Sequence, residues 1–256
     1  MALRATRQTG ATASHRLSTR AETRLKPIAA PQDAPERPAP RKRDAAATRA
    51  RILEAARAAF AREGFAGARV EQIARGAATN VQMIYRYFGD KEGLYRAVLE
   101  ATYRHLRSLE QGLDLTALGP VDGLRRLVEF TFDYLRDTPE FVAIIRNENM
   151  AGASFARQMP QIHESAHPLV AAIDDLLARG RAAGVFTKDR DTDMDAVDLY
   201  VTILSLCITH VSQRETLSVL FSRDFGDPAW LARRRAQVVA IVLTVLTAPS
   251  PCAPRA

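Results

Sequence analysis

The sequence contains only two cysteines, Cys207 and Cys252, among its 256 residues. Two cysteines exclude a disulfide framework and a four-cysteine metal site, and Cys207 lies in an apolar run, where a reduced, packed thiol is the ordinary outcome. Long apolar runs are also lacking, because the best one, residues 238–246, is far shorter than the ~18 residues that a membrane span needs. Residues 1–30 show no apolar core of a signal peptide. We therefore expect a cytoplasmic protein without a membrane anchor.

Excess positive charge is confined to the front of the chain. The formal net charge is +7, and residues 1–43 account for all of it, with ten basic and three acidic side chains. Five prolines in this segment break any long amphipathic helix, which favours a disordered basic arm over an organelle transit peptide. The remaining residues carry as many acidic as basic groups. This asymmetry indicates an anionic partner for the front of the chain.

No strand-like alternation of apolar and polar residues persists anywhere in the chain. Apolar residues instead recur at helical spacing, as Ile52, Ala56 and Phe60 do in the first such segment. Nearly every break carries the residues of a helix end, and prolines such as Pro120 stand where helices are expected to begin. The sequence therefore predicts an all-α fold.

Residues 48–94 contain a long helical segment and then two very short ones, residues 70–75 and 81–88, which a tight turn at residues 77–80 separates. Asn80 suits the N-cap of the second short helix, because its side chain can accept hydrogen bonds from free amides. Ile84 and Phe88, four residues apart, are expected to face the core. A short helix, a tight turn and a second short helix with an exposed face form a helix-turn-helix, whose second helix enters the DNA major groove.

The exposed positions of this second short helix suit contacts with DNA. Gln82 can bond base edges, and Val81 and Met83 can touch a thymine methyl group. Three further side chains are expected to reach phosphates: Tyr85, Tyr87 and Lys91.

The same segment closely resembles the DNA-binding domain of the tetracycline-repressor-type (TetR family) transcriptional regulators. The matching positions are Thr48-Arg49, Ile52-Leu53, Ala55-Ala56, Phe60, Gly64-Phe65, Val70, Ile73-Ala74, Ala77, Tyr85, Tyr87-Phe88, Lys91 and Leu94. The resemblance implies an N-terminal three-helix helix-turn-helix domain, followed by an α-helical ligand-binding and dimerisation domain. It also implies a homodimer that binds a palindromic DNA operator and releases it when a small-molecule effector enters a C-terminal pocket.

The resemblance also assigns roles to individual residues. Positions that face bases in the family are occupied by Val81, Gln82, Met83 and Tyr85, and positions that contact phosphates by Tyr87 and Lys91. Arg69 and Glu71 occupy positions that touch the DNA backbone or an outer base, and Arg49 of the first helix completes the predicted DNA contacts: Arg49, Arg69, Glu71, Val81, Gln82, Met83, Tyr85, Tyr87 and Lys91.

Two departures from the family pattern affect local detail. The family usually has Thr or Ser where Arg69 stands, so the cap of the helix that follows is expected to be lost or shifted. The usual turn Gly-Val-Ser is Ala78-Thr79-Asn80 here, which keeps the cap but places a Cβ where glycine normally relieves the turn.

The chain is thus expected to have four parts. Residues 1–43 form the disordered basic arm, and residues 44–94 the helix-turn-helix DNA-binding domain. Residues 95–248 form the helical effector-binding and dimerisation domain, and residues 249–256 a disordered tail.

Two stretches near the C-terminus, residues 199–213 and 236–254, contain no Asp, Glu, Lys or Arg. A helix that is apolar all round must be covered on all sides. We expect these helices to pair with a second subunit in a four-helix interface across a two-fold axis. The alternative is the core of a monomer.

Seven side chains of the C-terminal part are candidates for the effector pocket: Tyr134, Phe141, Arg146, Asn149, His167, Tyr200 and His210. Arg146 is a candidate partner for an anionic effector, although an intramolecular ion pair explains it equally well. His210 lies between uncharged stretches, which is more typical of a satisfied core or interface histidine. The aromatic residues stand at core spacing and can also border a cavity.

Residues 163–167 read His-Glu-Ser-Ala-His, the H-E-x-x-H pattern of zinc proteases. In that motif both histidines bind the metal from one unbroken helix, and the glutamate is the general base. Pro168 follows directly and disfavours helical backbone at His167, so we expect His167 at an N-cap. A metal-dependent hydrolase using His163, Glu164 and His167 is therefore the less favoured alternative, and we predict neither a metal nor another cofactor.

We interpret the chain as a DNA-binding transcriptional regulator and not an enzyme. The favoured form is a repressor that a small-molecule effector releases from DNA. An activator or a nucleoid-associated protein without an effector is the other non-enzymatic alternative.

Overall fold

Helices make up the regular structure of the computed structural model, which describes residues 40–187 and 194–247. The all-α prediction is confirmed. The described residues all belong to one compact unit, Ala39–Ala256, which does not include the first 38 residues. Most of the predicted basic arm and all of the predicted tail, residues 249–256, lie outside the described residues.

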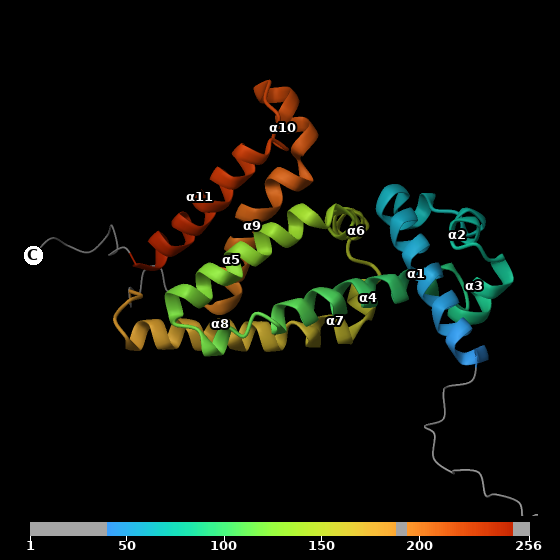
Figure 1. Ribbon diagram of the computed structural model, residues 1–256, viewed down its shortest axis with the longest axis horizontal. Coiled ribbons are helices and arrows are strands. Elements are labelled where there is room, and N and C mark those ends of the chain that lie inside the picture. The colour runs from blue at the N-terminus through green and yellow to red at the C-terminus, as the bar shows by residue number, and fades with distance from the viewer. Residues whose placement is uncertain (1–39, 188–193, 248–256) are drawn as a thin grey trace, which may run out of the picture. The chain divides into compact units, whose positions relative to one another are not determined.

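The helices follow one another through the whole described chain (Figure 1). Their bounds are α1 Pro40–Gly67, α2 Val70–Gly76, α3 Val81–Phe88, α4 Lys91–Gln111, α5 Pro120–Asp137, α6 Pro139–Met150, α7 Pro160–Ser165, α8 His167–Ala182, α9 Ala196–Ser212, α10 Arg214–Phe221 and α11 Pro228–Thr247. Two single 3-10 turns, η1 Leu115–Ala117 and η2 Ala156–Gln158, lie between them.

Helices α1, α2 and α3 pack with the first half of α4 around a small core. Its centre consists of fully buried side chains: Ile52, Phe60, Ile73, Ile84 and Leu94. Each such side chain contributes roughly 1.5–3 kcal/mol by leaving water. The same core also takes Ile144 from α6, so the three-helix unit is closed by a helix that lies far along the chain.

The long α1 contains a break at Gly64, where φ is 67°. Only glycine adopts this left-handed conformation without a steric cost, and it lets the chain turn toward α2.

Helices α5, α8, α9 and α11 enclose a second, larger core. Its fully buried members include Leu127 and Phe132 of α5, Ile173 of α8 and Ile203 of α9. Arg235 of α11 adds polar links to α5, with nitrogen–oxygen distances of 2.9 Å to Asp133 and 3.1 Å to Glu129.

One predicted helix cap is wrong. His167 is the first residue of α8 and not its cap, a place that Ala166 takes without a side-chain bond. Thr138 stands at the N-cap position of α6, but its hydroxyl donates to the Tyr134 carbonyl at the end of α5 and not to α6.

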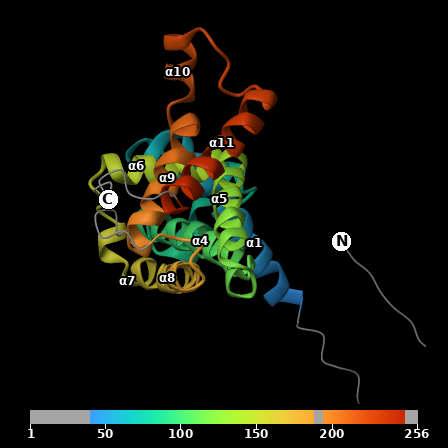
Figure 2. The same ribbon diagram turned by 90° about the vertical axis from the view of Figure 1, so that its left-hand side faces the viewer.

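Each of α9 and α11 leaves an apolar face exposed. Val197 and Val201 of α9 are 52% and 54% exposed, and Ile241 and Val245 of α11 are 42% and 43% exposed. We call these four residues the α9–α11 face. Helix α10 projects beyond the other helices in both ribbon views (Figures 1 and 2).

No single helix among the described residues is long and apolar enough to cross a membrane. Helices α9 and α10 taken together have the length and apolar composition of a membrane span, but they meet at a bend of 70°. Cys207 of α9 is a fully buried free thiol in the second core, as predicted, and burial raises its pKa to about 12.

Candidate nucleic-acid interface and ligand cavity

The turn between α2 and α3 fixes the second short helix by its N-terminus. The side chain of Asn80 accepts a hydrogen bond from the amide of Met83 at 2.9 Å, which confirms the predicted cap. Ala78 has a φ of 48°, so the Cβ that stands in place of glycine is held in left-handed backbone. Asp90 caps α4 in the same way through the amide of Gly93, at 2.7 Å.

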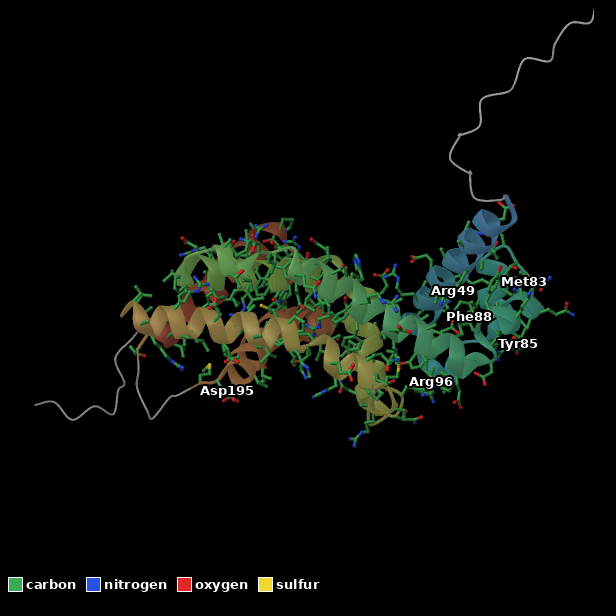
Figure 3. The ribbon with its side chains drawn as sticks, turned by 90° about the horizontal axis from the view of Figure 1, so that it is seen from below. Arg49, Met83, Tyr85, Phe88, Arg96 and Asp195 are labelled. Carbon is green, nitrogen blue, oxygen red and sulfur yellow. The ribbon has the colours of Figure 1, made fainter. Side chains whose placement is uncertain are left out.

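Helix α3 is anchored by one side and open on the other. Ile84 is fully buried, and Phe88 packs at the edge of the same core. Gln82 and Tyr85 are exposed, and three further predicted DNA contacts are partly exposed: Val81, Met83 and Tyr87. Met83 and Tyr85 lie at one extremity of the described unit, opposite Asp195 of the C-terminal helices (Figure 3).

Two basic side chains are held by aromatic rings near α3. Arg49 lies over the ring of Phe88 with its Cζ 5.1 Å from the ring centroid, which places a cation of α1 beside α3 (Figure 3). Lys91, the first residue of α4, is held against the end of α1, where its Nζ donates to the Ala66 carbonyl at 3.4 Å and lies 4.9 Å from the Phe65 ring centroid.

The start of α2 is also open to an approaching ligand. Arg69 and Glu71 are exposed, and Arg69 makes no side-chain cap bond, so the expected loss of this cap is confirmed. Arg86 of α3 is exposed as well and was not predicted as a contact. Arg86 directly follows Tyr85 and lies two positions from each of the buried-face residues Ile84 and Phe88. That spacing could have predicted that its side chain is exposed beside Tyr85.

The arrangement presents a short, capped helix whose polar side is free and whose flanks carry cations. Such a helix can enter the major groove of DNA while the flanking cations neutralise phosphates. Three of the predicted DNA contacts, Arg49, Met83 and Tyr85, lie at the same end of the described unit (Figure 3).

Helix α6 ties this unit to the C-terminal helices through two side chains that the sequence analysis missed. Asn147 donates to the carbonyls of Phe60 and Ala61 in α1, at 3.2 and 3.3 Å. Glu148 is buried and accepts from the Tyr95 hydroxyl at 3.0 Å, and from the amides of residues 155 and 156 at 2.8 and 2.9 Å. We call these contacts the α6 clamp.

A cavity of about 450 Å³ lies beside the clamp, between α1, α4 and the turn from α5 to α6. Apolar and aromatic side chains form most of its wall, and charged groups stand at its edge. The lining residues that matter here are Leu53, Glu54, Arg57, Val98, Ala101, Thr102, Tyr134 and Phe141. Its size and mostly apolar wall are typical of sites for small molecules.

Comparisons with known proteins bear on both features. Residues 52–98 match the family model of bacterial regulatory proteins of the tetR family, and residues 120–242 match that of the tetracyclin repressor-like C-terminal domain. The chain belongs to the TetR family. It is therefore a DNA-binding transcriptional regulator and not an enzyme.

Relatives of this TetR-family regulator include the HTH-type transcriptional repressor NicS of Pseudomonas putida. It is 39% identical over 180 residues, which cover 70% of this chain and 83% of NicS. Among solved structures, the regulator SCO4942 of Streptomyces coelicolor is 27% identical with a TM-score of 0.59, covering 79% of this chain and 99% of that one. FadR of Bacillus subtilis, solved in complex with stearoyl-CoA, shares the fold at 15% identity and a TM-score of 0.58, over 76% and 97% of the two chains.

The predicted effector residues of this TetR-family chain do not form one site. Tyr134 and Phe141 line the cavity beside α1 and meet edge to face, with ring centroids 5.3 Å apart. Arg146 and His210 line a separate hollow of about 430 Å³ between α5, α6, α9 and α10. The other three are elsewhere: Asn149 and His167 are exposed, and Tyr200 donates to Glu110 at 3.0 Å.

His210 is buried against other rings. Its imidazole stacks on Phe132, with centroids 4.5 Å apart, and meets the edge of Trp230 at 5.9 Å. Neither ring nitrogen has a hydrogen-bond partner among the described residues. Burial, with smaller contributions from Arg234 and Arg136, lowers the pKa of His210 to about 4, so the ring is neutral at neutral pH.

The H-E-x-x-H segment is interrupted by the boundary between two helices. His163 belongs to α7 and His167 starts α8, with the ring centroids 4.9 Å apart. In the described part of the chain, no group of three or more His, Cys, Asp or Glu side chains is placed to hold a metal ion. The segment therefore lacks the continuous helix that the zinc motif requires.

Proposed function

We propose that this regulator is a homodimeric repressor in the cytoplasm, which binds a palindromic DNA operator and leaves it when a small-molecule effector binds. Residues 44–94 act as its DNA-binding domain, and residues 95–248 hold the effector and form the dimer. The observation that carries the proposal is the open side of α3, which is capped by Asn80, anchored by Ile84 and flanked by Arg49 and Lys91.

Readout of DNA follows from the chemistry of this surface. Gln82 offers an amide to base edges, and Val81 and Met83 offer apolar contact to a thymine methyl group. Tyr85, Tyr87 and Lys91 are assigned to phosphates or adjacent bases, and Arg49, Arg69 and Glu71 to the flanking backbone. Two copies of α3 in a dimer must lie about 34–36 Å apart to enter successive major grooves on one side of the duplex.

The proposed dimer forms through the α9–α11 face. Val201 and Ile241 belong to uncharged helix segments but remain exposed in a single chain. A second copy related by a two-fold axis would cover both helices with the same apolar surface, giving a four-helix interface. The repressor sign is supported by the relative NicS, which is named a transcriptional repressor.

The test starts from genomic DNA fragments that the purified, full-length protein retains at moderate salt. A shared palindrome in those fragments supplies the operator, and fluorescence anisotropy then gives the affinity. We expect Tyr85→Ala to weaken operator binding by at least tenfold, with an unchanged unfolding midpoint, because Tyr85 is exposed in the free protein.

The matched control is Tyr103→Ala on α4, since it removes the same side chain away from α3. It is expected to leave operator affinity unchanged at temperatures where the variant is folded. Retention of no DNA by the wild type, or full affinity in Tyr85→Ala, would contradict the proposal.

A further inference from the structure

Exposed apolar side chains gather on three consecutive helices at the C-terminal end of the described chain. Beyond the α9–α11 face, they include Val219, Leu220 and Phe221 of α10, which are 80%, 68% and 65% exposed. We call these three residues the α10 tip. No charged residue stands between Glu215 and Arg223, so the tip is an uncharged apolar surface. Apolar patches that remain in water mark sites of interaction with a partner.

Helix α10 gains little packing from its own chain. It has eight residues, Arg214–Phe221, and none of them is buried. Isolated helices shorter than about 12–15 residues are marginal in water, because few hydrogen bonds offset the ordering of the backbone. Helices in proteins owe most of their stability to the packing of an apolar face. For α10, that packing has to come from outside the subunit.

Although α10 is exposed, a row of aromatic rings fixes its position. Neighbouring rings of this row have centroids 4.5 to 6.2 Å apart, and the row leads from the second core to the tip through Phe132, His210, Trp230, Phe225 and Phe221. Phe132 is fully buried, whereas Phe221 is exposed. Aromatic pairs at such distances attract one another beyond the area they bury. The row therefore holds α10 in a defined direction, projecting beyond the other helices (Figures 1 and 2).

Polar contacts close the base of this projection and leave the α10 tip free. Arg214 lies 3.4 Å from Asp224 across the base, and the Ser218 hydroxyl accepts from the Phe225 amide at 3.5 Å. The bend of 70° between α9 and α10 carries the tip out of line with α9. Because α9 leads into α10 and α11 follows it, the tip continues the part of the chain that bears the α9–α11 face. A partner that covers this face meets the tip beside it.

We propose that the α10 tip packs on the second subunit of the dimer, so that each subunit reaches over its partner with α10. The uncharged stretches of α9 and α11 offer apolar contact to an uncharged tip, so the chain itself supplies a surface of matching chemistry. A two-fold axis gives both tips the same surface and leaves neither in water. The proposal rests on the proposed function for the dimer, and it adds a contact outside the α9–α11 face.

The first test places the photoreactive amino acid p-benzoylphenylalanine at position 221 of the full-length protein. Illumination should join two chains covalently, and a mixture of light and heavy isotope-labelled protein shows by mass spectrometry that the link connects different subunits. The matched control carries the same amino acid at position 150, because Met150 is 81% exposed on α6, away from α10. It should give no link between chains. Links that stay within one chain of a dimeric protein would overturn the proposal.

The second test measures what the contact contributes to dimer affinity. Leu220→Ser removes an apolar side chain from both tips, so sedimentation at decreasing concentration should show a dimer dissociation constant raised on the order of tenfold or more. Met150→Ser, a similar change at a comparably exposed residue, should leave the dissociation constant unchanged. Both variants should keep the helical content of the wild type, because neither side chain is buried. Equal dissociation constants in the two variants would overturn the proposal.

This proposal and the proposed function fail in different ways. A wild type that stays monomeric at every concentration contradicts both. A dimer without links between chains at position 221 contradicts the tip contact alone and leaves the proposed function standing. A species larger than a dimer that Leu220→Ser removes would assign the α10 tip to contacts between dimers, which also overturns the proposal.

Discussion

Ala78 is a non-glycine residue in left-handed backbone, at the turn that positions α3. A Cβ in this conformation costs roughly 1–2 kcal/mol, and glycine removes that cost while adding flexibility to the unfolded chain. We expect Ala78→Gly to raise the free energy of unfolding by about 1 kcal/mol, as measured by urea denaturation. Ala58→Gly, at an exposed site within α1, should lower it by a similar amount because helical backbone favours alanine. Equal changes at both positions would contradict the role of backbone conformation.

His210 gives the stability of the protein a specific pH dependence. The unfolded histidine has a pKa of about 6.5, whereas burial lowers it to about 4 in the folded state. As the pH falls from 6.5 toward 4, the unfolded state therefore binds a proton that the folded state does not, and stability decreases by on the order of 3 kcal/mol. His210→Phe keeps a ring against Phe132 and should remove this part of the pH dependence. Unfolding curves of both proteins across this range would show parallel slopes if His210 were not responsible.

At the scale of elements, the α6 clamp joins two helices that are distant in the sequence. Asn147→Ala removes the amide that binds the Phe60 and Ala61 carbonyls and should cost about 1–2 kcal/mol of stability. Asn149→Ala serves as the control, because this residue is exposed on the same helix and should change stability by less than about 0.5 kcal/mol. Thermal unfolding of the two variants is the measurement. An equal loss of stability in both would indicate a general effect of alanine in α6 and not the loss of the α6 clamp.

The sequence predicted those elements whose limits are set by local chemistry. Asn80 acts through its own backbone neighbourhood, so the turn of the helix-turn-helix could be placed in advance. His167 was misplaced by one residue, because a proline is tolerated in the first turn of a helix and α8 already begins ahead of Pro168.

Contacts between distant segments could not be read in the same way. Asn149 and Asn147 look equivalent in the sequence, but only the packing of α6 on α1 turns Asn147 inward. For the same reason the seven predicted effector residues divide among several places, since composition identifies polar and aromatic side chains but not which helices meet.

For the whole molecule, the proposed dimer requires that the α9–α11 face stays apolar, because a second subunit covers it. Replacing Val201 and Ile241 together by glutamate would place charges in the centre of the interface. We expect this variant to be a folded monomer by light scattering and to lose operator affinity by at least a hundredfold, because each half-site alone is bound weakly. Leu109→Glu is the control, since Leu109 of α4 is a comparably exposed apolar residue, 38% exposed, outside that face. A dimeric double variant would place the interface elsewhere.

The buried thiol of Cys207 also provides a chemical probe for the opening of the larger core. A thiolate is the species that alkylating reagents attack, and a pKa of about 12 leaves almost none of it at neutral pH while α9 stays packed. Labelling of Cys207 therefore proceeds only as fast as α9 opens to solvent. The modification rate of this one sulfur, followed by mass spectrometry, reports how often the C-terminal core opens and whether a bound ligand or DNA slows that opening.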